Sequence, residues 1–241
     1  MTPQVQTLLK AMDAGDPVLF ADIDVVHCVI NGEVVVFCLD READPIQRNN
    51  RAGKFYEAPE LRWIAKLAPP DATFIDIGAN IGNHALYFAK FLGAAKVIPV
   101  EPNPVAYRLL MANTLLNRVG DVVDLTRLGV GLSNRNIGGF AVEERERNIG
   151  GTRMLEDGGD LWVYRGDTLF AGETPSVIKI DVEGMEIDVL AGLEATIATH
   201  RPLLLVEVDG RMLMPFAIGV VTTGTQRSRN GNATAATATT C

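Results

Sequence analysis

The sequence has few cysteines and a deficit of positive charge, and each of these excludes certain classes of function. Its three cysteines, Cys28, Cys38 and Cys241, have neither metal-binding nor redox spacing, and the first two lie among apolar residues. We expect Cys28 and Cys38 to be small core residues in a reducing, cytoplasmic setting. The formal net charge of −8 argues against non-specific binding to nucleic acid or anionic membranes, because both need a basic surface.

Long hydrophobic runs are also missing. No apolar run approaches the ~20 residues that span a membrane. Residues 1–17 lack the basic start and apolar core of a secretory signal. We therefore expect neither a membrane partner nor a nucleic-acid partner. The 241 residues suffice for one sizeable core, or for a domain with a small extension.

From Phe74 onwards, short apolar segments alternate with amphipathic ones. This order predicts a doubly wound, mostly parallel sheet of the Rossmann-like α/β class. The expected strands are residues 74–77, 97–100, 121–128, 176–182 and 203–208. The expected helices are residues 80–92, 104–117 and 184–199, and a further helix over 56–67 precedes the first strand.

Residues 1–55 are expected to form an N-terminal extension, with a short helix in residues 1–17. A β-hairpin follows, because Val25–Ile30 and Glu33–Cys38 flank Asn31-Gly32, a strong hairpin turn signal. Residues 40–58 are polar and predict a loop.

Two later segments interrupt the strand–helix alternation of the main domain, residues 56–210. Residues 133–175 are rich in Gly, Asn, Arg and Glu and predict an inserted hairpin or lid, with strand-like islands at 139–142 and 161–164. Residues 211–241 form an atypical tail that is almost free of large apolar residues from 222 onwards. We expect this end to be disordered and to leave the C-terminal edge of the sheet incomplete.

Three acidic residues stand at the ends of predicted parallel strands. Asp76, Glu101 and Asp181 come at or directly after the apolar runs of the first, second and fourth strands. In doubly wound sheets the ligand binds at the carboxyl ends of the strands, where the winding reverses. We therefore expect these three side chains to meet in one crevice.

The glycine spacing after the first strand discriminates between nucleotide cofactors. Dinucleotide sites use G-x-G-x-x-G, whereas here Gly78 and Gly82 have three residues between them and follow Asp76. A carboxylate repels pyrophosphate but suits a cationic ligand. Glu101 lies about 25 positions after Asp76, near the place of the acidic residue that binds ribose hydroxyls. An adenosine cofactor with a cationic tail and no phosphate is S-adenosylmethionine.

Three segments resemble the FkbM family of S-adenosylmethionine-dependent methyltransferases. They are residues 74–83 (FIDIGANIGN), 100–104 (VEPNP) and 179–186 (KIDVEGME), and the resemblance extends over roughly residues 18–208, including Tyr56-Glu57. It implies that residues 56–210 are a class I methyltransferase domain. It also implies O-methylation of a hydroxyl on a small molecule or sugar-containing metabolite.

The resemblance further implies a set of cofactor-binding residues. Asp76, Gly78, Asn80 and Gly82 would hold the methionine part, and Glu101 would hold the ribose hydroxyls. Residues 128–131 would lie near the adenine. The full predicted set is Glu57, Asp76, Gly78, Ala79, Asn80, Gly82, Glu101, Pro102, Asn103, Gly129, Val130 and Asp181.

The predicted catalytic residues are Asp181, Glu183 and His84. An alcohol loses its proton as it attacks a methyl group, and Asp181 or Glu183 is a candidate general base or acceptor orienter. Capping of the following helix explains these two acids nearly as well. His84 is a second choice, and a packed helix residue is the simpler interpretation. Two carboxylates without a third ligand predict no metal site, although a divalent ion is compatible with them.

A second function remains open. If the C-terminal edge is missing, the chain would bind the cofactor without transferring a methyl group. Glu207, near the end of the fifth strand, is interpreted as structural.

Overall fold

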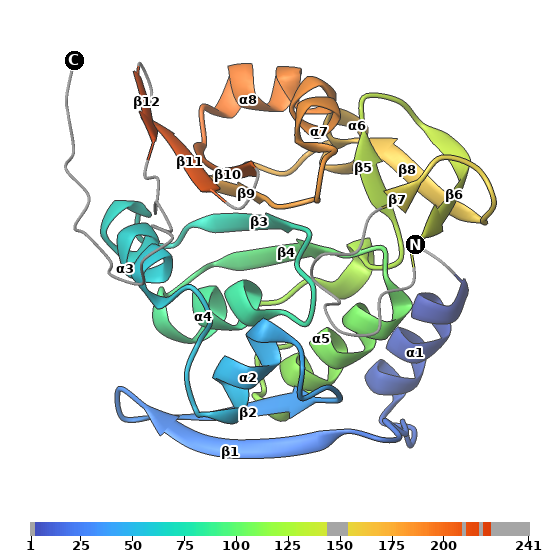
Figure 1. Cartoon of the computed structure of the whole chain (residues 1–241), viewed down its shortest axis with the longest axis vertical. Coiled ribbons are helices and arrows are strands. Elements are labelled where there is room, and N and C mark those ends of the chain that lie inside the picture. The colour runs from blue at the N-terminus through green and yellow to red at the C-terminus, as the bar shows by residue number, and fades with distance from the viewer. Residues whose placement is uncertain (1–2, 144–153, 209–210, 217–218, 223–241) are drawn as a thin grey trace.

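The computed structural model describes residues 3–143, 154–208, 211–216 and 219–222. A six-stranded sheet with the order β12-β11-β10-β9-β3-β4 runs through its centre (Figure 1). The first four strands along the chain are parallel to one another, and the last two are antiparallel. They are β3 (Thr73–Ile77), β4 (Lys96–Val100), β9 (Val177–Ile180), β10 (Leu203–Val208), β11 (Arg211–Phe216) and β12 (Gly219–Thr222). The predicted Rossmann-like α/β fold is confirmed.

Helices cover both faces of this sheet (Figure 1). One face carries α3 (Ala58–Leu67), α4 (Asn83–Phe91) and α5 (Pro104–Leu116), and the other carries α6 (Gly166–Leu169), α7 (Glu186–Gly192) and α8 (Glu194–His200). The strand side chains alternate between two cores, as a pleated strand requires. Phe74 stacks on Phe88 of α4 with ring centroids 4.4 Å apart, whereas Ile75 and Ile77 share the second core with Val189 of α7.

The N-terminal extension joins the first of these cores. It contains α1 (Pro3–Ala14) and the antiparallel hairpin of β1 (Asp24–Ile30) and β2 (Glu33–Leu39), which turns at Asn31-Gly32 as predicted. Asn113 of α5 and Asn117, which caps the C-terminus of α5, hold the free edge of β2. The Asn113 carboxamide oxygen accepts the Cys38 N–H at 2.7 Å, and that of Asn117 accepts the Val36 N–H at 2.9 Å.

The predicted loop over 40–58 contains a helix, α2 (Pro45–Arg51). The Asp44 carboxylate accepts the N–H groups of Ile46 and Gln47 at 3.0 Å, and proline occupies the first helical position. The polar composition of this segment predicts a loop, but capping by Asp44 forms a helix here without an apolar periodicity.

Two elements of the main domain also differ from expectation. The predicted strand over 121–128 is reduced to two isolated bridges, Val97–Val123 and Glu101–Leu128, with a short 3-10 helix, η1 (Leu125–Arg127), between them. Asp124 causes this turn, because its carboxylate accepts the Thr126 N–H. The predicted helix over 184–199 is two helices, α7 and α8.

The segment inserted after β4 and α5 forms a second sheet with the order β5-β8-β6-β7. The two strand-like islands become β6 and β8, which pair antiparallel as a hairpin requires. Residues 144–153 of the predicted lid lie outside the described residues. The four strands are β5 (Gly131–Ser133), β6 (Ile137–Val142), β7 (Met154–Leu155) and β8 (Leu161–Arg165).

The expectation of an incomplete C-terminal edge is wrong. β11 pairs with β10 through Val206–Leu213, Glu207–Met212 and Val208–Arg211, and β12 pairs with β11. These two strands consist mainly of apolar residues, and the polar composition that suggested a disordered tail begins only at residue 222. Residues 223–241, for which disorder is predicted, lie outside the described residues. No helix in the described part of the chain has the length and apolarity needed to cross a membrane.

Candidate functional site

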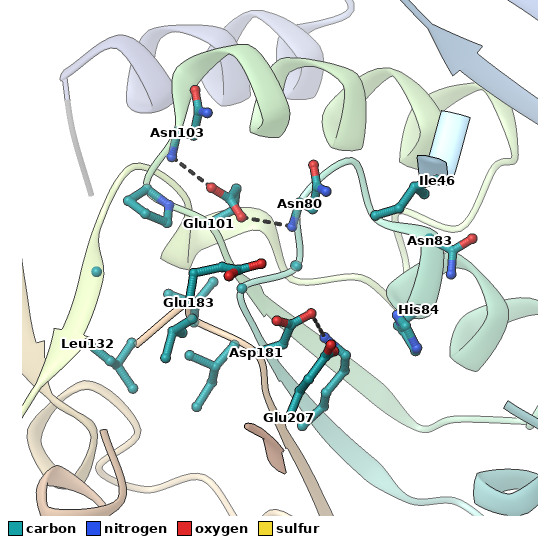
Figure 2. A pocket seen from close by; sticks show the side chains of 18 of the residues that line it. Ile46, Asn80, Asn83, His84, Glu101, Asn103, Leu132, Asp181, Glu183 and Glu207 are labelled. Carbon is teal, nitrogen blue, oxygen red and sulfur yellow. Dashed lines mark hydrogen bonds and ion pairs between the residues drawn. The ribbon is translucent and has the colours of Figure 1, made fainter. Parts of the chain in front are cut away.

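A cavity opens at the carboxyl ends of β3, β4, β9 and β10 (Figure 2). Two of the three strand-end acids, Glu101 and Asp181, line it together, as the sequence predicts. Ten of the predicted site residues line this cavity: Glu57, Gly78, Ala79, Asn80, His84, Glu101, Pro102, Asn103, Asp181 and Glu183.

The other predicted residues lie nearby but outside this wall. Asp76 is fully buried below the cavity, and Gly82 lies behind the turn. Gly129 and Val130 line a neighbouring cavity, and Gly131 and Leu132 occupy the wall instead. Of residues 128–131, the segment expected near the adenine, only Gly131 lines this wall, at the point where the chain enters β5.

Gly78 brings the first turn against the end of β9. Its φ is +78°, and a Cβ atom there would lie 1.7 Å from the main-chain oxygen of Asp181. The N–H groups of Gly78 and Ala79 both donate to the Val100 carbonyl at 3.0 Å. The turn is thus fastened to β4 on one side and packed on β9 on the other.

The helix after this turn begins at Asn83, not at Asn80 as predicted. Asn80 and Gly82 have φ values of +50° and +85°, which an α-helix does not contain. A Cβ atom on Gly82 would lie 2.9 Å from Leu110 Cγ of α5. These left-handed residues extend the loop over the cavity before α4 starts.

Glu101 is buried where β4 ends. Its two carboxylate oxygens accept the N–H groups of Asn80 and Asn103, each at 2.8 Å (Figure 2). Burial raises the pKa of Glu101 to about 7; the two hydrogen bonds oppose this rise, and the charges of Asp181 and Asp76 add to it. A carboxylate fixed in this way has lone pairs left for hydroxyl groups of a ligand.

Lys179 is the positive centre of the site. Its ammonium group lies 3.0 Å from the Asp181 carboxylate and 3.8 Å from Asp76, and it is almost wholly buried. Burial alone would lower the pKa of Lys179, but Asp181, Asp76 and Glu57 raise it above its ordinary value. Lys179 is therefore a fixed cation. Neither oxygen of Asp76 has a hydrogen-bond partner among the described residues.

His84, on the first turn of α4, faces Glu57. The His84 Nε2 and Glu57 Oε2 atoms are 3.3 Å apart without hydrogen-bond geometry, so their attraction needs a protonated ring. Burial alone would raise the pKa of Glu57, but His84 and Lys179 hold it below its ordinary value. The Asn83 side chain holds this segment, since its oxygen accepts the Tyr56 N–H at 3.0 Å and its amide donates to the Tyr56 carbonyl at 3.2 Å.

Among the lining residues missing from the predicted set are three titratable ones, Lys179, Glu207 and Tyr56. Glu207 follows the apolar residues of β10, so the strand-end rule that selected Asp181 would also have selected it. Burial raises the pKa of Glu207 to about 8; Asp181 and Glu57 add to this rise, and Lys179 opposes it. Burial also raises the pKa of Tyr56 to about 12, with a further contribution from Glu57.

The charges of the cavity decide which cofactor fits. Lysine and arginine contribute only Lys179 to the described lining, against five carboxylates: Glu57, Glu101, Asp181, Glu183 and Glu207. Such a wall repels phosphate groups and attracts a cation. The glycine turn gives close main-chain approach, and Glu101 suits ribose hydroxyls. An adenosine cofactor with a cationic tail therefore fits these residues. Among the described residues, no group of three or more His, Cys, Asp or Glu side chains is arranged to hold a metal ion.

The parallel sheet, the glycine turn and the acid at the end of β4 define a Rossmann-like cofactor-binding protein. A family model described as the methyltransferase FkbM domain matches residues 76–217, more than half of the chain. The chain belongs to this family of methyltransferases, which confirms the resemblance found in the three sequence motifs.

Individual relatives match part of the chain. It is 32% identical over 142 residues to hexuronic acid methyltransferase AglP of Haloferax volcanii, covering 57% of this chain and 56% of AglP. It is 30% identical to AMB antimetabolite synthetase AmbE of Pseudomonas aeruginosa, covering 59% of this chain and 9% of AmbE. The crystal structure of methyltransferase FkbM from Methylobacillus flagellatus is similar with a TM-score of 0.42 and 20% identity, over 63% of this chain and 40% of that one. The chain thus spans about half of AglP and a small part of AmbE.

Proposed function

We propose that this chain binds S-adenosylmethionine and methylates a hydroxyl oxygen on a small molecule or a sugar-containing metabolite. The observation that carries the proposal is the charge of the cavity. Its described lining holds five carboxylates and one lysine over a glycine turn, which suits a cationic adenosine cofactor and not a dinucleotide.

Each part of the cofactor has a counterpart in the site. Glu101 would accept hydrogen bonds from the ribose hydroxyls, because its carboxylate is already oriented by two N–H groups. The turn from Gly78 to Asn80 would lie along the methionine part, and Asp181 would attract its ammonium group. When bound, the cofactor supplies an electrophilic methyl group, so the protein needs no nucleophile of its own.

The protein's task is then to place and deprotonate the acceptor. Alignment of two reactants supplies a large part of the rate enhancement when their geometry is fixed. The paired Asp181 and Lys179 give a rigid polar floor, and Glu183 and His84 line the same cavity. Asp181, Glu183 and His84 remain the sequence-based candidates for acceptor orientation and proton transfer.

A sugar acceptor is supported by the name of one relative. AglP is described as a hexuronic acid methyltransferase, and the aligned region covers 57% of this chain. The competing proposal, a protein that binds the cofactor without transferring the methyl group, depended on a missing C-terminal edge. β11 and β12 supply that edge, so we favour an active enzyme.

Calorimetric titration with S-adenosylmethionine tests the cofactor, and transfer of a radiolabelled methyl group to a panel of hydroxylated sugars and sugar acids tests the reaction. The Glu101→Ala variant should lose binding at least 10-fold while it stays folded by circular dichroism. Glu173→Ala is the matched control, because Glu173 contacts Lys96 at the opposite end of β4. Unchanged binding by Glu101→Ala would show that the cofactor lies elsewhere.

A further inference from the structure

Glu207 stands in the same row as the charged residues of the site. β10 runs parallel to β9, with Leu205 opposite Lys179 and Val206 opposite Ile180. Continued by one residue, this register places Glu207 beside Asp181 at the carboxyl ends of the two strands. Because side chains alternate along a strand, Glu207 projects from the same face as Lys179 and Asp181.

The close-up of the cavity agrees with this register. Figure 2 shows Glu207 beside Asp181, at the end of the cavity away from Glu101 and Asn103. The cavity therefore has two polar ends. One end holds Glu101, the acid proposed to bind the ribose hydroxyls. The other end holds Glu207, together with Asp181, Lys179 and Glu57.

The other acids at this end are already engaged. Asp181 forms an ion pair with Lys179 at 3.0 Å, which already occupies one of its carboxylate oxygens. Glu57 faces His84 at 3.3 Å. In the described part of the chain, the Glu207 carboxylate has no hydrogen bond or ion pair. It is half-buried at the cavity wall, so it is free to accept a proton from a ligand.

We propose that Glu207 is the catalytic base that accepts the hydroxyl proton of the acceptor; this rests on the methyltransferase function proposed above. The acceptor oxygen forms a bond to the methyl carbon as the sulfur–methyl bond breaks. The electron pair of the broken bond leaves with sulfur, and the hydroxyl proton moves to a Glu207 carboxylate oxygen. Asp181 and Lys179 act beside it as positioning residues.

A catalytic base must be deprotonated when the acceptor arrives. We infer that binding of the cofactor removes the proton from Glu207. The pKa of Glu207 is about 8, so most of the free protein carries the proton near pH 7. A sulfonium ion bound in the same cavity lowers the pKa of the carboxylates around it and expels this proton. The charged and titratable groups that face Glu207 are Asp181, Lys179, Glu57, Glu183 and Tyr56.

Proton release on ligand binding tests this inference without an acceptor. Calorimetric titrations near pH 7.5, in two buffers with different ionisation enthalpies, give the protons released per ligand bound. S-adenosylmethionine and S-adenosylhomocysteine are compared, because they differ in the sulfonium charge but share the adenosine that contacts Glu101. We expect S-adenosylmethionine to release more protons, by on the order of half a proton.

Variants assign the proton to its residue. The difference between the two ligands should vanish in Glu207→Gln and persist in Glu60→Gln, the matched control. Glu60 lies on α3 outside the cavity lining. Equal proton release for the two ligands in the wild type, or a difference that persists in Glu207→Gln, overturns the inference while the proposed function stands. Failure of both ligands to bind overturns the proposed function as well.

A kinetic measurement then separates a base from a residue that only shapes the wall. With the sugar that accepts label in the panel above, Glu207→Gln should slow single-turnover transfer about 10²–10⁴-fold and abolish the rise of rate with pH. Glu207→Asp, which keeps a carboxylate, should retain that pH dependence. A wild-type rate in Glu207→Gln would contradict the assignment.

Discussion

Replacement of Gly78 by alanine tests whether the turn must lie directly against β9. In the structure a Cβ atom at this position would lie 1.7 Å from the main-chain oxygen of Asp181, and the φ of Gly78 is +78°. That oxygen belongs to the backbone, so no rotation of a side chain relieves the overlap. The turn and the end of β9 must separate by roughly 1.3 Å to reach a tolerable distance of 3.0 Å.

The magnitude follows from the contacts that this separation breaks. An alanine in the left-handed region costs about 1–2 kcal/mol. Separation also strains two main-chain hydrogen bonds, from Asp181 N–H to the Ile77 carbonyl and from Gly78 N–H to the Val100 carbonyl, both 3.0 Å long. At about 0.5–1.5 kcal/mol each, their loss brings the expected decrease in the free energy of unfolding to about 2–5 kcal/mol.

Urea denaturation followed by circular dichroism measures this change, and calorimetry measures the affinity for S-adenosylmethionine. Gly172→Ala is the matched control, because Gly172 has a φ of +89° and no atom within 4 Å of the added methyl group. We expect Gly172→Ala to lose only about 1–2 kcal/mol and to bind normally. If the two variants were equally stable, or if Gly78→Ala bound the cofactor normally, the proposed tight turn would be refuted.

Two further perturbations address the buried charges. Lys179→Met should lower the free energy of unfolding by about 3–5 kcal/mol, since it leaves Asp76 and Asp181 without their cation. Lys96→Met, which removes a partly exposed ion pair, is the control and should lower it by less than about 1 kcal/mol. Equal losses for the two variants in urea denaturation would contradict this prediction. Glu101, with its pKa raised to about 7, binds a proton more readily in the folded than in the unfolded chain, so its contribution to stability is lost as pH rises from about 4.3 to about 7. The stability of the wild type relative to Glu101→Gln should therefore fall by about 2–4 kcal/mol across that window in denaturation at several pH values, and a constant difference would disprove the raised pKa.

Local sequence chemistry was sufficient for much of the fold. The buried strand before Gly78, the hairpin at Asn31-Gly32 and β10 all follow from the pattern of apolar residues and turn residues, which act over a few positions. Where a side chain overrode that pattern, the prediction failed. Asp44 caps an unexpected helix, and Asp124 turns a predicted strand into a 3-10 helix.

The prediction of an incomplete C-terminal edge failed for a different reason. β11 and β12 consist mainly of apolar residues and are held by main-chain pairing to a neighbouring strand. The polar composition that suggested a disordered tail begins only at residue 222. Pro215 lies beyond the part of β11 that pairs with β10, and it stands opposite Val220 of β12. A sequence does not show which strand edges are open to receive another strand.

The sequence by itself determined the family, the Rossmann-like sheet and the cation-favouring turn, because these depend on short motifs and strand-end positions. Only the tertiary structure decided how the charges are shared. It placed Asp76 below the cavity, paired Asp181 with Lys179, and put Glu207 on the cavity wall in their row. The register between β9 and β10 sets these relations. It arises from packing between segments far apart in the chain, and that packing determines which carboxylate is free to take a proton.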